Sequence, residues 1–252
     1  MLVIAHRGAL NEAQENSWAA FEAAIAAKAD RLELDVRLTK DKFPIVMHDD
    51  NLGHMTGHWV KVSELSLAEL RTIKLKNGEA IPTLEEVVER LLPRIEINIE
   101  TKDGGRECPR ETGAVVKNSP HSEKVIFSSF RNDHLEYFRD YHRDIRRACL
   151  WGCFESDARS LANIAPQVFL ERIETNIFHP MAKLVSQNMM EQAKLRNWIV
   201  YPWDSVIGEE NRDAEGLWTA LKTYGVDGLC TNYPRQLRAW LEEIKLDERK
   251  FL

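Results

Sequence analysis

The chain has 252 residues, of which 44% are apolar and 29% charged, and its formal net charge is −6. This length suits one large core, such as a single eight-stranded α/β barrel, but also two small domains. The negative charge disfavours non-specific attraction to nucleic acid or anionic membranes, although a local basic pocket remains compatible with it. No apolar run is long enough to span a bilayer, so we expect no stable membrane insertion.

The N-terminal residues and the cysteines indicate a cytoplasmic protein. Residues 1–7 lack the charged region and long apolar region of a secretory signal. The four cysteines form no C-x-x-C pair, and no second ligand pair accompanies the two that are four positions apart. We therefore expect reduced thiols and no zinc site. The cysteines are Cys108, Cys149, Cys153 and Cys230.

The first predicted strand covers residues 3–5 and ends in His6, Arg7 and Gly8. Such a short apolar run is typical of a buried parallel strand, and α/β barrels carry their chemistry at the carboxyl ends of such strands. Either polar residue alone would also fit an ordinary strand end. A helix with an N-cap at Asn16-Ser17 follows, and Glu15-Asn16 at its start is either a supporting contact of the site or only part of the cap.

The segment 31–36 alternates acidic and apolar residues. Glu33 and Asp35 are two positions apart, so in a strand their side chains point to the same face. Two like charges on a buried face are costly, and a hard divalent cation with oxygen ligands would offset them. The alternative is the solvated face of an edge strand.

Another short strand is predicted at residues 45–47, ending in His48-Asp49-Asp50. Residues 51–80 then break the β-α rhythm, and we interpret them as a small insertion, too short to bury much apolar surface alone. Capping-box patterns at Ser66 and Thr83 predict helix starts. In the strand at 94–102, isoleucines alternate with polar residues, and Glu100 and Lys102 lie at its carboxyl end.

Further strands are predicted at 125–130, 145–150, near 175–178, 198–203 and 226–231, with helical patterns between them. Eight strands of parallel type, plus the extra strand at 45–47, favour a (β/α)8 TIM barrel over a doubly wound sheet. No dinucleotide or P-loop fingerprint is present. We therefore predict one TIM-barrel domain over residues 1–252, with residues 51–80 as an insertion after the strand ending at His48.

The candidate chemical groups all follow strands and would share one face of the barrel. Three carboxylates suit a Ca²⁺ or Mg²⁺ ion, two histidines suit general acid and base, and two cations suit a phosphate. This set suits metal-assisted attack at phosphorus. The residues are His6, Arg7, Glu33, Asp35, His48, Glu100 and Lys102, and Trp203 follows another strand.

With this set of residues, the chain resembles the glycerophosphodiester phosphodiesterase family. The matching runs occur in the family's order and cover nearly the whole chain. They are Ile4-Ala5-His6-Arg7-Gly8, Glu15-Asn16-Ser17, Glu33-Leu34-Asp35-Val36, Val46-Met47-His48-Asp49, Ile81-Pro82-Thr83-Leu84-Glu85-Glu86, Asn98-Ile99-Glu100-Thr101-Lys102 and Gly225-Val226-Asp227-Gly228.

The resemblance implies hydrolysis of glycerophosphodiesters to glycerol 3-phosphate and an alcohol, with one divalent cation, Mg²⁺ or Ca²⁺. It implies that the cation is held by the three carboxylates, that the two histidines are the acid and base, and that the two cations contact the phosphate. Either water or a metal-bound glycerol hydroxyl would be the attacking group. The implied ligands are Glu33, Asp35 and Glu100, the acid/base pair His6 and His48, and the phosphate contacts Arg7 and Lys102.

The chain also departs from the family's pattern. Gln14 replaces a common Pro and is expected to loosen a loop, while His54 replaces an Arg in the insertion. Asp204-Ser205 replaces Thr-Val after Trp203, and Asn232 replaces Asp. We place these changes around the alcohol side of the substrate, which Trp203 and Phe178 would line if they are not ordinary barrel packing.

Two alternatives follow. In the first, the same fold acts on another phosphodiester, such as a lysophospholipid or a sugar phosphodiester. In the second, a barrel that has lost catalysis only binds a phosphodiester. The second alternative requires the loss of a histidine or carboxylate from the site, and none is lost. The sequence contains no basic tract with interleaved aromatic residues, so we do not expect a nuclease. The expected partner is a small-molecule phosphodiester. Oligomeric state is left open.

Overall fold

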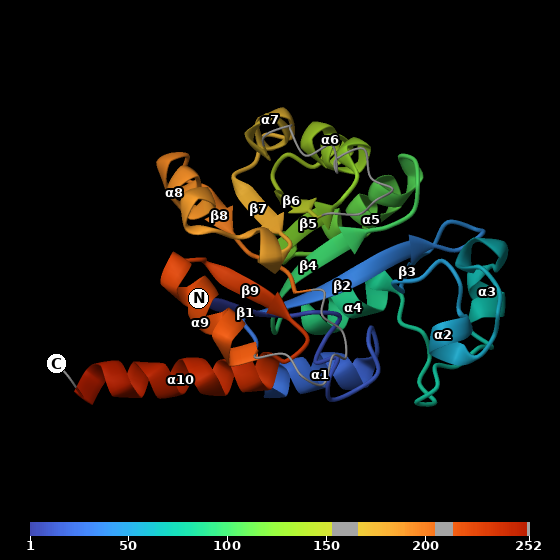
Figure 1. Cartoon of the computed structure of the whole chain (residues 1–252). Coiled ribbons are helices and arrows are strands. Elements are labelled where there is room, and N and C mark those ends of the chain that lie inside the picture. Colours follow the sequence, from blue (N-terminus) through green and yellow to red (C-terminus); the bar gives the residue numbers. More distant parts are fainter. Residues whose placement is uncertain (153–165, 205–213, 251–252) are drawn as a thin grey trace.

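In a computed structural model of the chain, which describes residues 1–152, 166–204 and 214–250, eight parallel strands curve into a nearly closed barrel (Figure 1). Their spatial order is β8-β7-β6-β5-β4-β2-β1-β9. This confirms the predicted (β/α)8 architecture. The parallel strands are β1 (Leu2–Ala5), β2 (Arg31–Leu38), β4 (Glu96–Thr101), β5 (Val125–Ser129), β6 (Arg146–Trp151), β7 (Ile177–Pro180), β8 (Ile199–Val200) and β9 (Gly228–Thr231).

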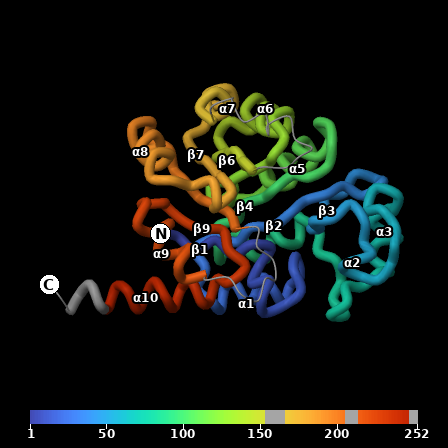
Figure 2. The backbone as a smooth tube through the Cα atoms, in the orientation of Figure 1, coloured from blue at the N-terminus to red at the C-terminus, as the bar shows by residue number. Residues whose placement is uncertain are grey.

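Helices connect successive strands on the outside of the barrel, and the last and longest runs beneath it toward the C-terminus (Figures 1 and 2). Ser17 and Thr83 cap their helices as predicted, each accepting a backbone N–H of the first turn. The helices are α1 (Trp18–Ala26), α4 (Leu84–Leu91), α5 (Glu107–Lys117), α6 (Asn132–Tyr141), α7 (Pro166–Arg172), α8 (Gln187–Leu195), α9 (Ala214–Tyr224) and α10 (Pro234–Lys250), with 3₁₀ turns η2 (Ser122–Lys124) and η4 (Ala182–Leu184).

The barrel closes between β8 and β9 through a sparse set of hydrogen bonds. The Asp227 N–H donates to the Val200 carbonyl at 3.0 Å, and the Cys230 N–H donates to the Pro202 carbonyl at 2.8 Å. Strand β8 is short because Pro202 has no N–H to give to a ladder. Trp203, the next residue, still bridges β9 at Cys230.

The extra strand β3 (Pro44–Val46) pairs antiparallel with β2, outside the barrel order. It leads into residues 51–80, which lie beside β3 at one side of the barrel (Figure 1). Apolar side chains there form a small cluster that Ile45 and Met47, before the segment, and Ile81, after it, help to complete. The segment therefore does not bury its apolar surface alone. It contains α2 (Gly53–Thr56), η1 (Val62–Glu64) and α3 (Leu67–Leu70).

Alternation along β2 and β4 separates two environments. Leu32, Leu34, Ile97 and Ile99 belong to the main apolar cluster with the surrounding helices, whereas the residues between them are polar. The interior of the barrel below the carboxyl ends holds a separate cluster that includes Ile4, Ile126 and Tyr201. Among the described residues, no helix has the length and apolar composition needed to cross a membrane.

A fully buried histidine lies in this interior. His179 on β7 is 1% exposed, and its ring meets the Tyr201 ring edge-on at 5.4 Å between centroids. Burial, reinforced by the charge of Arg31, lowers the pKa of His179 to about 3. The folded protein therefore holds this imidazole neutral at pH values where the unfolded chain protonates it.

We predict that, as the pH decreases below 6.5, the free energy of unfolding of the wild type decreases relative to that of His179→Gln, because only the wild type has this buried neutral imidazole. Since the unfolded state binds the extra proton, this group lowers the free energy of unfolding by about 1.4 kcal/mol per pH unit between about pH 6 and 4. Urea unfolding of the wild type and the variant at pH 8, 5.5 and 4.5 measures the two slopes. Comparison of slopes removes any pH-independent cost of the substitution, and identical slopes would contradict the prediction.

Candidate active site

The carboxyl ends of the strands surround a pocket with a volume of about 210 Å³. One half is polar and formed by residues from β1, β2, β4 and the end of β3. The other half is largely apolar and formed by residues at the ends of β5, β6, β8 and β9, with His179 from β7. The lining residues are His6, Arg7, Glu33, His48, Asn98, Glu100, Lys102, Phe130, Leu150, His179, Trp203 and Cys230.

Three buried carboxylates meet on the polar side. Glu33 and Asp35 share one face of β2, and the strand register places Glu100 of β4 beside Asp35. One oxygen from each of the three lies within 4.8 Å of the others, and all three residues are at most 7% exposed. Three converging carboxylate oxygens fit the ligand preference of Mg²⁺ or Ca²⁺, with solvent or substrate oxygens completing the shell.

The electrostatics of this carboxylate triad also favour a cation. Burial, together with the charges of Asp35 and Glu100, raises the pKa of Glu33 well above its usual value. Burial likewise raises the pKa of Glu100. Burial alone would raise the pKa of Asp35 too, but Lys102 and Arg7 outweigh it and hold that pKa low. Additional positive charge at the triad would therefore stabilise the fully ionised form.

Lys102 and Arg7 already contact the triad. The Lys102 Nζ lies 2.6 Å from Glu100 Oε1 and 3.2 Å from Asp35 Oδ1, and the Arg7 Nε lies 3.3 Å from Asp35 Oδ2. Both cations line the pocket. They therefore neutralise carboxylates here, and the phosphate contact expected of them would be an additional interaction.

Arg7 is fixed in place by its surroundings. Its backbone has φ +53° and donates its N–H to Glu33 Oε2 at 2.9 Å, while its guanidinium binds both Glu15 oxygens at 2.9 and 3.1 Å. The Asn16 side chain donates to Asp35 Oδ2 at 3.0 Å. Glu15 and Asn16 are thus supporting contacts of the site, whereas the cap itself is Ser17.

The two histidines have different partners. His6 Nδ1 lies 2.6 Å from Asn232 Oδ1, and His6 Nε2 is 4.0 Å from Glu33. His48 Nδ1 lies 2.7 Å from Asp49 Oδ1. Burial, with the charge of Arg7, lowers the pKa of His6 to about 3. One imidazole therefore faces a neutral amide and the other a carboxylate.

Two residues that depart from the family's pattern make contacts that we did not expect. Asn232, which follows β9, was assigned to the alcohol side but hydrogen-bonds to His6, which follows the neighbouring strand β1. Gln14 was expected to loosen its loop; instead it donates to the Met55 carbonyl at 2.7 Å and accepts from the Asn77 N–H at 3.0 Å. Gln14 therefore ties the β1–α1 loop to residues 51–80. Ser205 and Cys153 lie outside the described residues.

The apolar half of the pocket contains Phe130, Leu150 and Trp203. Trp203 donates its indole N–H to the Trp151 carbonyl at 3.1 Å and meets Phe130 edge-on at 5.6 Å between centroids. Phe178, suggested for this wall, instead packs in the outer core against Trp198. Sequence reasoning missed Phe130 and Leu150, although each stands at the carboxyl end of a predicted strand.

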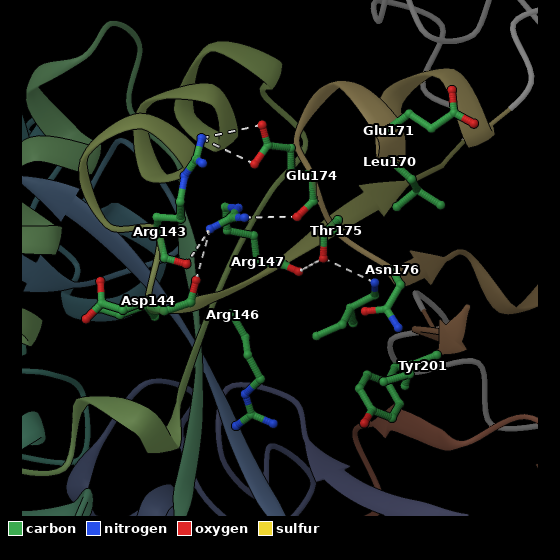
Figure 3. Close-up of a pocket in the computed structure, with 13 residues that line it drawn as sticks. Arg143, Asp144, Arg146, Arg147, Leu170, Glu171, Glu174, Thr175, Asn176 and Tyr201 are labelled. Atoms are coloured by element: carbon green, nitrogen blue, oxygen red, sulfur yellow. Dashed lines mark hydrogen bonds and ion pairs between the residues drawn. The ribbon is translucent and has the colours of Figure 1, made fainter. Parts of the chain in front are cut away.

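A larger cavity, of about 530 Å³, lies at the opposite end of β6, β7 and β8 (Figure 3). Its arginines are engaged by the protein: Arg147 donates to the Ile173 and Glu174 carbonyls, and Arg143 pairs with the Glu174 carboxylate. The amino ends of barrel strands generally serve stability, whereas the carboxyl ends serve catalysis. The smaller pocket is therefore the candidate active site.

Comparison with known proteins agrees with this choice. The model of the glycerophosphoryl diester phosphodiesterase family matches residues 6–236. The chain belongs to this family. A relative named glycerophosphodiester phosphodiesterase, from Caldanaerobacter subterraneus subsp. tengcongensis, is 31% identical over 94% of this chain and 96% of its own.

Two other matches differ in what they are named for. A lysophospholipase D of Rattus norvegicus is 26% identical to this chain over 96% of this chain and 86% of its own. A phosphodiesterase of Oleispira antarctica, solved in complex with the product sn-glycerol-3-phosphate, has a TM-score of 0.82, with 24% identity over 96% of this chain and 97% of its own. This structural likeness supports the barrel fold.

We predict that Glu15→Gln destabilises the protein by about 1–3 kcal/mol, because it leaves the buried Arg7 guanidinium without a charged bidentate partner. The matched control is Glu12→Gln, which breaks a solvent-exposed pair with Arg235. That control should cost less than about 1 kcal/mol. Urea unfolding measures both, and equal losses would show that burial of the Arg7 pair contributes nothing extra.

Proposed function

We propose that the chain hydrolyses glycerophosphodiesters to glycerol 3-phosphate and an alcohol, using one divalent cation, Mg²⁺ or Ca²⁺. The observation that carries the proposal is the buried triad of Glu33, Asp35 and Glu100 at a pocket that is also lined by His6 and His48. Family membership and the names of the relatives support it. The proposed substrate is a small molecule, without nucleic-acid or membrane partners.

Charge balance supports the presence of a divalent cation. The three carboxylates of the triad and Glu15, which pairs with Arg7, exceed the two cationic side chains, Arg7 and Lys102, by two charges. A divalent cation would offset this excess. A buried site is most stable when its charges compensate in this way.

In this mechanism, Glu33, Asp35 and Glu100 hold the cation, which when bound polarises the phosphoryl oxygens. Lys102 and Arg7 place positive charge where the phosphate gains negative charge during attack. Glu15 keeps Arg7 oriented toward the site. Trp203 contributes to the wall that the substrate contacts.

The partners of the histidines suggest separate roles. The amide oxygen of Asn232 only accepts, so His6 Nδ1 carries the proton and Nε2 is left as the acceptor, as a general base requires. The Asp49 carboxylate only accepts, so His48 Nδ1 donates to it and this contact orients the ring. We therefore propose that His6 withdraws the proton of the attacking water, or of a substrate hydroxyl whose attack forms a cyclic phosphate that water then opens to glycerol 3-phosphate. His48 protonates the leaving alcohol.

Hydrolysis of a lysophospholipid is the second candidate. Phe130, Leu150 and Trp203 form an apolar wall beside the polar half, which would accommodate an acyl or alkyl chain. A relative of this chain is named lysophospholipase D. We further propose that residues 51–80 are an insertion within one domain over residues 1–252, and that the protein is cytoplasmic.

We predict that purified protein releases glycerol 3-phosphate from glycerophosphocholine and glycerophosphoethanolamine, that EDTA abolishes release, and that Mg²⁺ or Ca²⁺ restores it. Coupled enzymatic detection of glycerol 3-phosphate measures the rate. Parallel assays with lysophosphatidylcholine test the second candidate. Hydrolysis that persists unchanged in EDTA after exhaustive dialysis would contradict the role of the cation.

We predict that His6→Ala and His48→Ala each lower kcat by about 10²–10⁴-fold, since each removes a group that transfers a proton. His54→Ala is the matched control because His54 is exposed in residues 51–80 and does not line this pocket. Its kcat should stay within about twofold of the wild type. Near-normal turnover of either pocket variant, with unchanged thermal unfolding, would remove that histidine from the mechanism.

A further inference from the structure

Two buried polar side chains line the pocket without taking part in the triad or the acid/base pair. Asn98 on β4 and His179 on β7 are each 1% exposed, and both line the pocket. Among the described residues, neither Asn98 Oδ1 nor His179 Nε2 has a hydrogen-bond partner. A buried polar atom without a partner is costly, so these two atoms are suited to a ligand that enters the pocket.

Their positions connect this pair of atoms to the triad. Asn98 lies two residues before Glu100 on the same face of β4, and it is paired in register with Glu33. His179 comes from a strand separated from β4 by β5 and β6. The two side chains therefore approach the pocket from different parts of the barrel wall, adjoining the carboxylates on the Asn98 side.

Their chemistry selects a hydroxyl group. An amide oxygen accepts a hydrogen bond, and a neutral imidazole has one donor and one acceptor nitrogen. A hydroxyl both donates and accepts, whereas an acyl chain or a quaternary ammonium would leave both atoms unpaired. The pocket volume of about 210 Å³ exceeds the volume of one water, about 30 Å³, several times over, so a polyol of a few carbons is a suitable occupant.

We propose that Asn98 and His179 form a hydroxyl subsite that binds the glycerol end of the substrate and so selects glycerol-containing diesters. The inference rests on the proposed function and adds the residues that recognise the substrate. The apolar wall of Phe130, Leu150 and Trp203 is then left to the departing alcohol. His179 is paired in register with Leu150 of this wall, so the hydroxyl subsite adjoins the space left to the alcohol.

A binding experiment tests the subsite without turnover. Isothermal titration of the cation-loaded protein compares sn-glycerol 3-phosphate with methyl phosphate, which has the phosphate but no hydroxyl. The wild type should prefer glycerol 3-phosphate, and Asn98→Leu and His179→Phe should each reduce that preference about tenfold, as expected for a lost buried hydrogen bond. His179→Gln, which retains hydrogen-bonding groups, should keep more of the preference than His179→Phe.

A second experiment separates this inference from the proposed function. Each variant is assayed with glycerophosphocholine and with bis(p-nitrophenyl) phosphate, which contains no glycerol. The inference expects kcat/KM to fall only for glycerophosphocholine. An equal fall for both substrates, no fall for either, or no wild-type preference for glycerol 3-phosphate over methyl phosphate would overturn it. Failure of the wild type to hydrolyse any diester would instead overturn the proposed function, while the titration would still test the subsite.

Discussion

The burial of three carboxylates at one end of the barrel is the constraint on which the rest of the site depends. Glu33, Asp35 and Glu100 are held close by the pairing of β2 with β4, so the backbone brings their charges together. Such a group is stable only with positive charge around it. Arg7 and Lys102 supply part of that charge from neighbouring strand ends.

The supporting contacts follow from the same constraint. Arg7 adopts a left-handed backbone conformation that lets its N–H bind Glu33 while its side chain reaches Asp35 and Glu15. Asn16 neutralises nothing but gives Asp35 a hydrogen bond. The conformation of the loop before α1 is therefore fixed by its contacts with the carboxylates. Gln14 connects this loop to residues 51–80. A rigid frame of this kind keeps charged groups in a fixed geometry for catalysis.

The sequence predicted the parts that depend on local periodicity. Alternation along 31–36 and 94–102 placed the carboxylates on shared faces, and the β-α rhythm predicted the barrel. It did not predict the contact between His6 and Asn232, because residues 226 positions apart meet only when the last strand pairs with the first. The sequence also did not decide whether Phe178 lines the pocket or packs in the core. In a short apolar strand, the face on which each side chain lies depends on the register with the neighbouring strands.

The central claim is that the triad binds a single divalent cation at the carboxyl end of the barrel. Anomalous diffraction from crystals grown with Mn²⁺, a substitute for Mg²⁺, tests it most directly. The account predicts one anomalous peak about 2.0–2.3 Å from oxygens of Glu33, Asp35 and Glu100, with Lys102 Nζ moved away from at least one of its two carboxylates. An ion bound elsewhere in the pocket, or no ion at the triad in protein that hydrolyses the diester, would contradict it.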